Sequence, residues 1–220
     1  MWDDARERLA EGGRAVLAPT LPVSAGRRTL GDWADDVLGM TGADLIPVGV
    51  SMGGYLTFEL WRRAPERIPA LVLADTRAQG ESVEGCETRN RTIAEIREGG
   101  PATLWRGLED RVLAPGASRE VRERARELVL SREPADLTAM VEAIRDRPDS
   151  TETLATISAP SLVVVGEEDA MVPLADAAEL ANALPHGRLR AIPGAGHLAP
   201  LERPEAFAAV VSAFLEEVGA

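Results

Sequence analysis

A short segment, Gly49-Val50-Ser51-Met52-Gly53-Gly54, restricts the fold of this chain more than any other part of its sequence. It places a serine midway between two glycines and directly after Leu45-Ile46-Pro47-Val48, an apolar run typical of a short buried strand. A strand that turns at once into a helix brings its backbone close to itself. Only residues without a side chain then fit two positions before and two positions after the turn. The segment therefore predicts a strand–turn–helix element that exposes the Ser51 hydroxyl at the end of a sheet.

The sequence after the turn is typical of the helix that this element needs. Residues Tyr55 to Ala64 place their apolar side chains on one face, and Pro65 ends the pattern. Met52 then opens the helix, so that its backbone N–H points toward whatever binds Ser51.

The composition indicates one soluble globular domain and excludes several classes of function. With 220 residues, 45% of them hydrophobic, the chain is long enough to bury a sizeable core. Its formal net charge of −12 repels nucleic-acid backbones and anionic membrane surfaces, so we expect neither as a partner. Every basic residue is arginine, and the lack of lysine excludes Schiff-base chemistry and the lysine of a phosphate-binding loop.

Cysteine usage and the amino terminus predict a cytoplasmic protein. Cys86 has no second cysteine with which to form an internal disulfide or a metal-binding pair, which suits a reducing compartment. The residues from Met1 to Arg6 lack the successive basic, apolar and small-residue zones of a signal peptide. No apolar run approaches the ~20 residues needed to span a membrane. We expect a protein that uses neither a metal nor another cofactor.

Strands and helices are expected to alternate over both ends of the chain, which predicts an α/β fold with a mostly parallel sheet and helices on both faces. The expected strands lie at residues 15–18, 45–48, 70–74, 161–165 and 189–192. The expected helices lie at residues 2–9, 30–40, 55–64, 174–184 and 204–218. Residues 20–30 are expected to form a polar loop.

Between the third and fourth of these strands, the pattern changes from alternation to helices alone. Four helices are expected near residues 84–98, 101–112, 119–131 and 134–147, with Arg and Glu on their outward faces. We therefore predict a helical lid over residues 81–149, inserted in an α/β core that consists of residues 1–80 and 150–220. The charged residues of the lid are interpreted as solvated faces rather than as a binding patch.

A serine hydroxyl needs a base to take its proton, normally a histidine whose second nitrogen is held by a carboxylate. Of the two histidines, His197 follows the small residues Gly194-Ala195-Gly196 in a loop directly after an expected strand, where its imidazole can reach across the sheet edge. His186 lies in an ordinary turn between a helix and a strand. His197 is therefore the candidate base, and His186 is expected at the surface.

The carboxylate should also follow a strand, because open parallel sheets gather their functional loops at the carboxyl ends of the strands. Asp169 follows the strand at residues 161–165 and precedes the helix that starts after Pro173. Glu167 and Glu168 are close alternatives, and Asp75, at the end of the preceding strand, is a weaker one. We predict Asp169 as the carboxylate.

The chain order Ser51, Asp169, His197 resembles that of the α/β-hydrolases over essentially the whole length of the chain. The segments Gly166-Glu167-Glu168-Asp169 and Pro200-Leu201-Glu202-Arg203-Pro204 add to the resemblance. It is greatest to the small hydrolases with a helical lid, among them enol-lactonases, carboxylesterases and cofactor-free haloperoxidases. The resemblance implies that Ser51 attacks an acyl carbon, His197 shuttles the proton and Asp169 orients His197. It also implies that the Met52 N–H stabilises the oxyanion.

The same resemblance predicts that part of the fold is missing. The family takes its second oxyanion donor from a loop, usually carrying His-Gly, that follows an earlier strand and precedes the helix expected at residues 2–9. We therefore expect the amino-terminal strands to be missing, with Met1 an internal methionine of a longer natural protein. Two sheet edges would then lack hydrogen-bonding partners, and an open edge favours association between copies of the chain.

The predicted function is cleavage of a small carboxylic ester or lactone by a serine hydrolase. A catalytically silent fragment or a binding protein is the alternative from another class, and perhydrolysis would use the same three residues with peroxide in place of water. Epoxide and haloalkane chemistry in this superfamily generally needs an aspartate at the position of Ser51, so neither is expected.

Substrate choice is expected to depend on the lid. Four apolar residues are candidates for its inward face, with packing of the lid as the alternative for each: Ile93, Leu104, Trp105 and Leu108. They predict a small, mostly apolar acyl or lactone substrate. Arg89 and Arg106 could bind a substrate carboxylate, and nothing in the sequence favours either.

Overall fold

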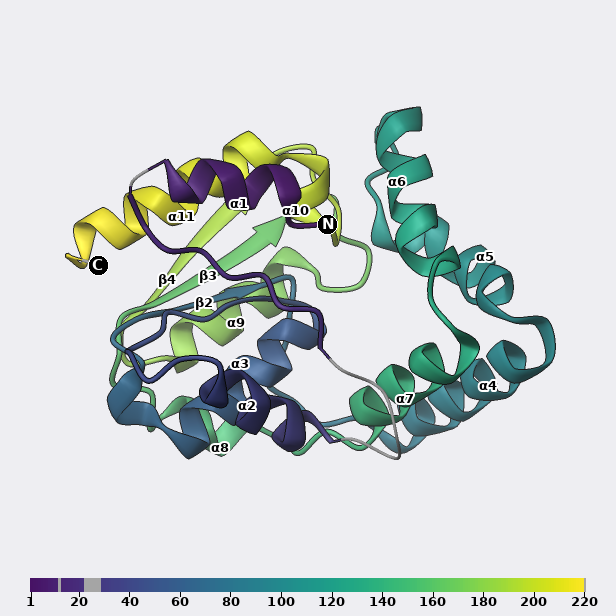
Figure 1. The fold of residues 1–220 in the computed structure, drawn as a ribbon, viewed down its shortest axis with the longest axis horizontal. Coiled ribbons are helices and arrows are strands. Elements are labelled where there is room, and N and C mark those ends of the chain that lie inside the picture. The colour runs from purple at the N-terminus through teal and green to yellow at the C-terminus, as the bar shows by residue number, and fades with distance from the viewer. Residues whose placement is uncertain (12, 22–28, 220) are drawn as a thin grey trace.

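Four parallel strands form the centre of the molecule (Figure 1). The structure is a computed structural model that describes residues 1–11, 13–21 and 29–219. The strands pair in chain order, and they are β1 (Val48–Val50), β2 (Leu71–Ala74), β3 (Ser161–Gly166) and β4 (Gly187–Ile192). The α/β fold class and its parallel sheet are confirmed.

The two central strands are buried on both faces. In β2, Leu71 and Leu73 point into one apolar cluster, whereas Val72 and Ala74 point into another on the opposite face. Strand β3 divides its residues between the same two clusters. Continuous apolar strands arise here because helices cover both faces of a parallel sheet.

Different helices supply the two layers (Figure 1). One face is covered by α1 (Asp3–Ala10) and α11 (Pro204–Glu217). The other face is covered by α2 (Leu30–Gly39), α3 (Met52–Arg63) and α9 (Leu174–Ala183). Three single-turn elements, which the sequence analysis did not predict, complete the core: the 3₁₀ helix Pro65–Arg67, α8 (Thr151–Leu154) and α10 (Ala199–Glu202).

A helical insertion lies between β2 and β3 and stands to one side of the sheet (Figure 1). It consists of α4 (Val83–Gly99), α5 (Pro101–Val112), α6 (Arg119–Leu130) and α7 (Pro134–Arg145). Its four predicted helices are thus confirmed, with ends that differ by two residues or fewer from those expected.

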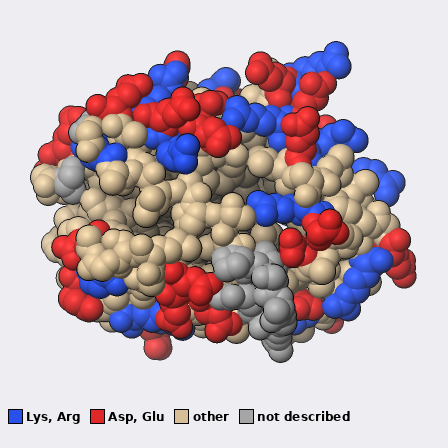
Figure 2. Space-filling model, viewed as in Figure 1, with Lys and Arg blue, Asp and Glu red and all other residues tan. Residues whose placement is uncertain are grey.

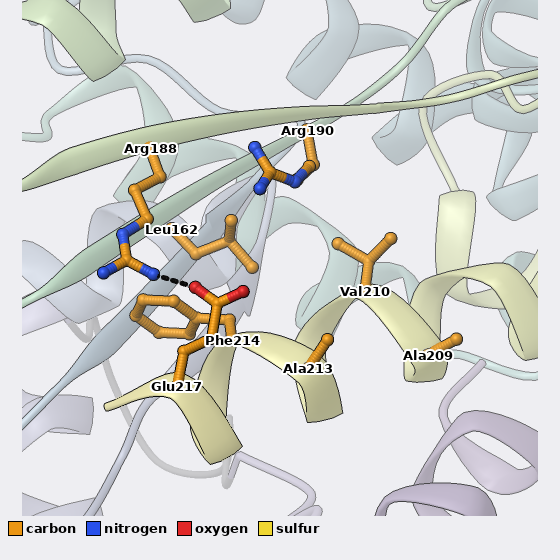
Figure 3. Close-up of a pocket in the computed structure, with 8 residues that line it drawn as sticks. All are labelled: Leu162, Arg188, Arg190, Ala209, Val210, Ala213, Phe214 and Glu217. Carbon is orange, nitrogen blue, oxygen red and sulfur yellow. Dashed lines mark hydrogen bonds and ion pairs between the residues drawn. The ribbon is translucent and has the colours of Figure 1, made fainter. Parts of the chain in front are cut away.

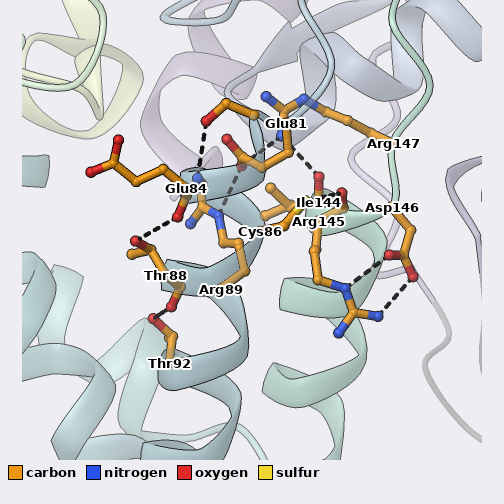
Figure 4. Close-up of polar contacts among 12 residues, drawn as sticks. Glu81, Glu84, Cys86, Thr88, Arg89, Thr92, Ile144, Arg145, Asp146 and Arg147 are labelled. Atoms are coloured by element: carbon orange, nitrogen blue, oxygen red, sulfur yellow. Dashed lines mark hydrogen bonds and ion pairs between the residues drawn. The ribbon is translucent and has the colours of Figure 1, made fainter.

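The base of the insertion is held by a buried arginine. The side chain of Arg147 is only 3% exposed, and its guanidinium bonds to Glu81 Oε2 at 2.9 Å (Figure 4). It also bonds to the Gln79 carbonyl at 3.1 Å. The guanidinium also lies 4.4 Å from the ring centroid of Tyr55 in α3. Glu81 lies at the start of the insertion and Arg147 lies near its end. These contacts therefore hold together the two segments that connect the insertion to the core.

Two strand predictions need correction. Residues 15–18 form no strand, and Leu17 is 70% exposed. A strand needs a neighbour for its N–H and C=O groups, and the sheet, in the part of the chain that is described, ends at β1. Strand β1 begins at Val48 rather than Leu45, because Pro47 has no N–H and the Leu45 N–H bonds to the Arg67 carbonyl instead.

The loop expected over residues 20–30 falls mostly outside the described residues. Across the described ranges, no helix combines the length and the apolar character needed to cross a membrane.

Candidate active site

Ser51 occupies the turn between β1 and α3 in a strained backbone conformation. Its φ is +52° and its ψ −113°, outside the regions that residues with side chains usually adopt. Its N–H still bonds to the Ala74 carbonyl of β2 at 2.9 Å, and its own carbonyl accepts from Gly54 N and Thr76 Oγ1, both at 2.9 Å. These three bonds hold the serine in place at the end of the strand.

The glycines around Ser51 matter for different reasons. A Cβ on Gly49 would overlap the backbone of Gly53, as the sequence analysis expects. A Cβ on Gly53, however, would meet no atom of the described residues within 4 Å, so the prediction that this position has no room for a side chain is wrong. The second crowded position is Gly54, where a Cβ would overlap the side chain of Thr76.

His197 lies in the loop between β4 and α10, which packs closely on the end of β3. A Cβ on Gly166 would overlap the carbonyl groups of Ala195 and Gly196. The Glu168 N–H bonds to the Ala195 carbonyl at 2.9 Å. This backbone contact brings the histidine loop beside the loop that carries Asp169.

The three predicted side chains form one hydrogen-bonded series. His197 Nε2 lies 2.8 Å from Ser51 Oγ, and His197 Nδ1 lies 2.8 Å from Asp169 Oδ2. His197 and Asp169 are buried, at 4% and 7% exposure, whereas Ser51 is partly exposed. Of the three residues, Ser51 is therefore the one most accessible to a solute.

The surroundings of Asp169 hold its carboxylate in place and select the tautomer of His197. Asp169 Oδ1 accepts hydrogen bonds from the N–H groups of Met171, at 2.7 Å, and Val172, at 3.0 Å. Donors directed at a carboxylate favour its charged form. A charged Asp169 can only accept, so the proton of a neutral imidazole lies on Nδ1, and Nε2 is left to accept from the serine hydroxyl.

Among the described residues, none of the alternatives takes a place in this hydrogen-bonded series. Glu167, Glu168 and His186 are exposed. Asp75 is buried at 1% exposure beside Asp169, and its Oδ1 accepts a hydrogen bond from the Gly166 N–H at 2.8 Å. The hydrogen bonds described for His197 go to Ser51 and Asp169.

Glu202 is a buried carboxylate whose role the sequence analysis missed. Its oxygens accept from the N–H groups of Gly196 at 3.0 Å, Leu198 at 3.2 Å and Ala114 at 2.7 Å. The first two flank His197, and Ala114 belongs to the insertion, between α5 and α6. The position of Glu202, five residues after the histidine and before a helix, was a signal, but the spacing alone does not reveal the bond to Ala114.

Met52 is the first residue of α3, as predicted. The first N–H groups of an α-helix have no acceptor within the helix, and they lie at its positive end. The Met52 N–H therefore belongs to a group suited to an anionic oxygen next to Ser51.

Two surface hollows lie away from this series. One, of about 270 Å³, lies between β4 and α11, where Arg188 and Glu217 form an ion pair (Figure 3). The other, of about 770 Å³, is lined by Trp61 and by residues of α8. Within the described ranges, no three His, Cys, Asp or Glu side chains are grouped as they would be to hold a metal ion.

The comparisons with known proteins agree with this geometry. The alpha/beta hydrolase family matches residues 1–210. A pimeloyl-[acyl-carrier protein] methyl ester esterase of Aromatoleum aromaticum is 29% identical over 229 residues, which cover 96% of this chain and 91% of the relative.

Among solved structures, a thermophilic esterase from Thermogutta terrifontis is 31% identical with a TM-score of 0.90, covering 100% of this chain and 85% of that one. The enol-lactonase from Burkholderia xenovorans LB400 is 27% identical with a TM-score of 0.75, covering 87% of this chain and 74% of that one. The strained serine turn, the parallel sheet and these matches lead to one conclusion: the chain belongs to the alpha/beta hydrolase family.

Proposed function

We propose that the protein is a serine hydrolase that cleaves a small carboxylic ester or lactone through an acyl-enzyme, with Ser51, His197 and Asp169 as the catalytic triad. The observation that carries the proposal is the pair of 2.8 Å contacts that joins Ser51 Oγ to His197 and His197 to Asp169. This arrangement has the groups that acyl transfer needs, namely a nucleophile, a base and a group that orients the base.

In the first step, His197 Nε2 takes the proton of Ser51 as Oγ bonds to the acyl carbon. The carbonyl oxygen becomes an oxyanion, which the Met52 N–H stabilises; such a donor is worth ~10²–10³ in rate. Asp169 stabilises the imidazolium that forms. The imidazolium then gives its proton to the leaving alkoxide, which departs as an alcohol or, for a lactone, as the hydroxyl of the opened ring.

In the second step, water attacks the acyl carbon of the ester formed on Ser51. His197 again takes a proton, now from water, and returns it to Ser51 Oγ as the acid leaves. All proton transfers use His197, and the reaction as written needs no cofactor.

We further propose that residues 81–149 act as the lid over this site and set its preference for a small, mostly apolar acyl group. One buried cluster joins Trp105 of α5 to Leu201, and Leu198, next to His197, packs against it. On the face drawn in Figure 2, uncharged residues gather along the middle, and charged side chains lie mainly around the edge. The named relatives, two esterases and an enol-lactonase, support this substrate class.

Of the candidate lid residues, Ile93 and Leu104 contribute to a cluster within the insertion itself, which favours packing over substrate contact. Trp105 and Leu108 belong to the cluster that reaches the histidine loop, and they are the better candidates for substrate selection. Arg89 is paired with Glu81 at 3.1 Å, and Arg106 bonds to Thr103 at 3.3 Å, so neither is specifically suited to a substrate carboxylate.

A fluorophosphonate probe tests the proposal, because it reacts with an activated serine and needs no knowledge of the substrate. Mass spectrometry of the labelled protein should place the adduct on Ser51 and find none in Ser51→Ala. Ser158→Ala, at an exposed serine outside the site, should label like the parent protein. Hydrolysis of p-nitrophenyl esters and simple lactones should show the same dependence on Ser51.

Folded protein that neither labels nor hydrolyses any of these compounds would instead support a binding protein or a catalytically silent fragment. The assembled contacts of the three side chains favour turnover over that reading.

A further inference from the structure

Asp75 is a buried acid next to the proposed triad, and the mechanism above does not use it. It follows β2 with a φ of +48°, in the left-handed region, where Asp and Asn are tolerated better than most residues with side chains. Its N–H bonds to the Val164 carbonyl of β3 at 2.9 Å, and its Oδ1 accepts from the Gly166 N–H at 2.8 Å. These bonds direct the carboxyl group toward the loop that carries Asp169.

The second oxygen of Asp75 is the unusual atom. Oδ2 is buried, and no hydrogen-bond donor of the described residues reaches it. The carboxyl group of Asp75 lies beside the carboxylate of Asp169, which is itself a hydrogen-bond acceptor. Two ionised carboxylates in this arrangement would repel each other in a site from which water is excluded, whereas one proton between them converts the contact into a hydrogen bond.

Comparison of the three buried acids around His197 indicates which one holds the proton. Glu202 accepts hydrogen bonds from three backbone N–H groups, and Asp169 accepts from two backbone N–H groups and the imidazole. Among the described residues, only the Gly166 N–H donates to Asp75. Because donors stabilise the charged form, Asp75 is the least compensated of the three carboxylates.

The electrostatics agree with this ranking. Burial raises the pKa of Asp75 well above its ordinary value, and the carboxylates of Asp169 and Glu202 raise it further, against the opposing effect of the Gly166 N–H. A carboxylic acid whose pKa is raised in this way can be neutral at pH 7 and then serves as a hydrogen-bond donor.

We propose, on the basis of the proposed hydrolase function, that Asp75 is a neutral acid at pH 7 whose Oδ2–H donates a hydrogen bond to Asp169, and that it is a positioning residue for the Asp169–His197 pair. The proton stays on Asp75 throughout the reaction. The bond fixes the orientation of the Asp169 carboxylate and satisfies a buried oxygen. It also leaves Asp169 as the one carboxylate charge in direct contact with the imidazole.

Asp75→Asn provides the main test, because Asn reproduces a neutral acid. Its amide oxygen accepts from Gly166, its amide group donates to Asp169, and Asn tolerates the left-handed backbone. We expect kcat within about 3-fold of the parent protein, and an acid limb of the kcat/KM pH profile that is unchanged to within about 0.3 unit. Asp176→Asn, the same change at an exposed position, is the control.

An ionised Asp75 would behave differently. Removal of a negative charge near His197 would lower the pKa of the imidazolium and move the acid limb down by about 1 pH unit. A displacement of that size in Asp75→Asn, with none in Asp176→Asn, would overturn the proposal.

Asp75→Gly removes the donor without adding strain, because glycine adopts a positive φ freely. With the hydrogen bond to Asp169 lost, kcat should fall about 10-fold. A kcat equal to that of the parent protein would show that Asp75 does not position Asp169.

An infrared measurement tests the proton independently of turnover. At pH 7 the parent protein and Asp176→Asn should show the carbonyl band of a protonated carboxylic acid, and Asp75→Asn should lack it. The absence of this band from the parent protein would refute the neutral acid even if Ser51 reacts with the fluorophosphonate. Conversely, the band could be present in a protein whose Ser51 is unreactive, so the two proposals fail separately.

Discussion

The α/β core and the helical insertion bury their side chains to different degrees. Among the largest fully buried side chains of the described residues, Ile96 alone belongs to the insertion, whereas Trp33, Phe58 and Phe207 belong to the core. The insertion instead carries ion pairs on its outer faces, such as Arg97 with Glu142. The core can therefore hold reacting atoms rigidly, while the insertion depends on a small number of attachments to keep its place.

The largest expected effect is on kcat, in a core variant whose fold should be preserved. Asp169→Asn keeps the size of the side chain but lets its amide donate, so that His197 is held in the wrong tautomer. We expect kcat for ester hydrolysis to fall about 10⁴-fold. The midpoint of urea unfolding measures whether the fold survives. A kcat within 10-fold of the parent value, in a folded variant, would mean that Asp169 does not orient His197.

The next largest effect tests Glu202, a core residue that contacts both the histidine loop and the insertion. Glu202→Gln places an amide donor against one of the three backbone N–H groups that the carboxylate now satisfies. We expect a loss of about 2–3 kcal/mol in the free energy of unfolding, and kcat should fall about 10-fold because the histidine loop loosens. Denaturant unfolding and ester kinetics measure the two effects.

Glu216→Gln, the same change at an exposed position of α11, is the matched control for Glu202→Gln and should change neither quantity. Equal stability of Glu202→Gln and its control would show that Glu202 does not anchor the loop and the insertion.

A smaller effect concerns the base of the insertion and depends on pH. Burial acts to raise the pKa of Glu81, but Arg147 and Arg89 outweigh it and hold the pKa below its ordinary value. The folded state then binds fewer protons than the unfolded state in acid, so the stabilisation is present at neutral pH and is lost as the pH falls through the lowered pKa. The pKa of Asp75 in the core is raised instead, so its contribution to the free energy of unfolding is lost as the pH rises.

Glu81→Gln should therefore cost about 1 kcal/mol at neutral pH and give an unfolding free energy that declines less steeply below pH ~5 than that of the parent protein. Urea unfolding at a series of acidic pH values measures both curves. Parallel curves would contradict a stabilising role for the contact between Glu81 and Arg147.

The smallest effect is expected on the outer face of the insertion. Arg119 and Glu123 lie 2.7 Å apart in α6, but their side chains are 91% and 59% exposed. Exposed pairs of this kind contribute little, so Arg119→Ala should change the free energy of unfolding by less than about 0.5 kcal/mol. A loss above 1 kcal/mol in thermal or urea unfolding would mean that the surface charges of the insertion stabilise it more than its attachments suggest.

The features that could be predicted are those that depend on residues close together in the sequence. The buried strands β2 and β3 follow from continuous apolar runs, and the turn at Ser51 follows from the glycine spacing. Whether a strand forms at residues 15–18 depended on a partner strand, which their own composition does not specify. The apolar pattern there was therefore misleading.

The site shows the same division. His197 and Asp169 could be chosen because each follows a strand, and parallel strands direct such loops to one edge of the sheet. The lack of room for a side chain at Gly54 depends on Thr76, and the role of Glu202 depends on Ala114. Neither could be predicted, because these residues come into contact only when the chain folds. Asp75 was recognised as an acid near the site, but its single donor is a property of the packed structure.

The bond between Glu202 and Ala114 has a consequence for exchanging the insertion between relatives. The insertion is attached to the core through its two connections near Glu81 and Arg147, and also at a third point within its length. A transplanted insertion can vary the outward-facing residues of its helices, but it must present a backbone N–H at the position of Ala114 to Glu202. Grafts that omit this donor would leave a buried carboxylate oxygen without a partner beside the histidine loop. Diversity in substrate choice is therefore easier to engineer on the outward faces of these helices than in the segment that joins α5 to α6.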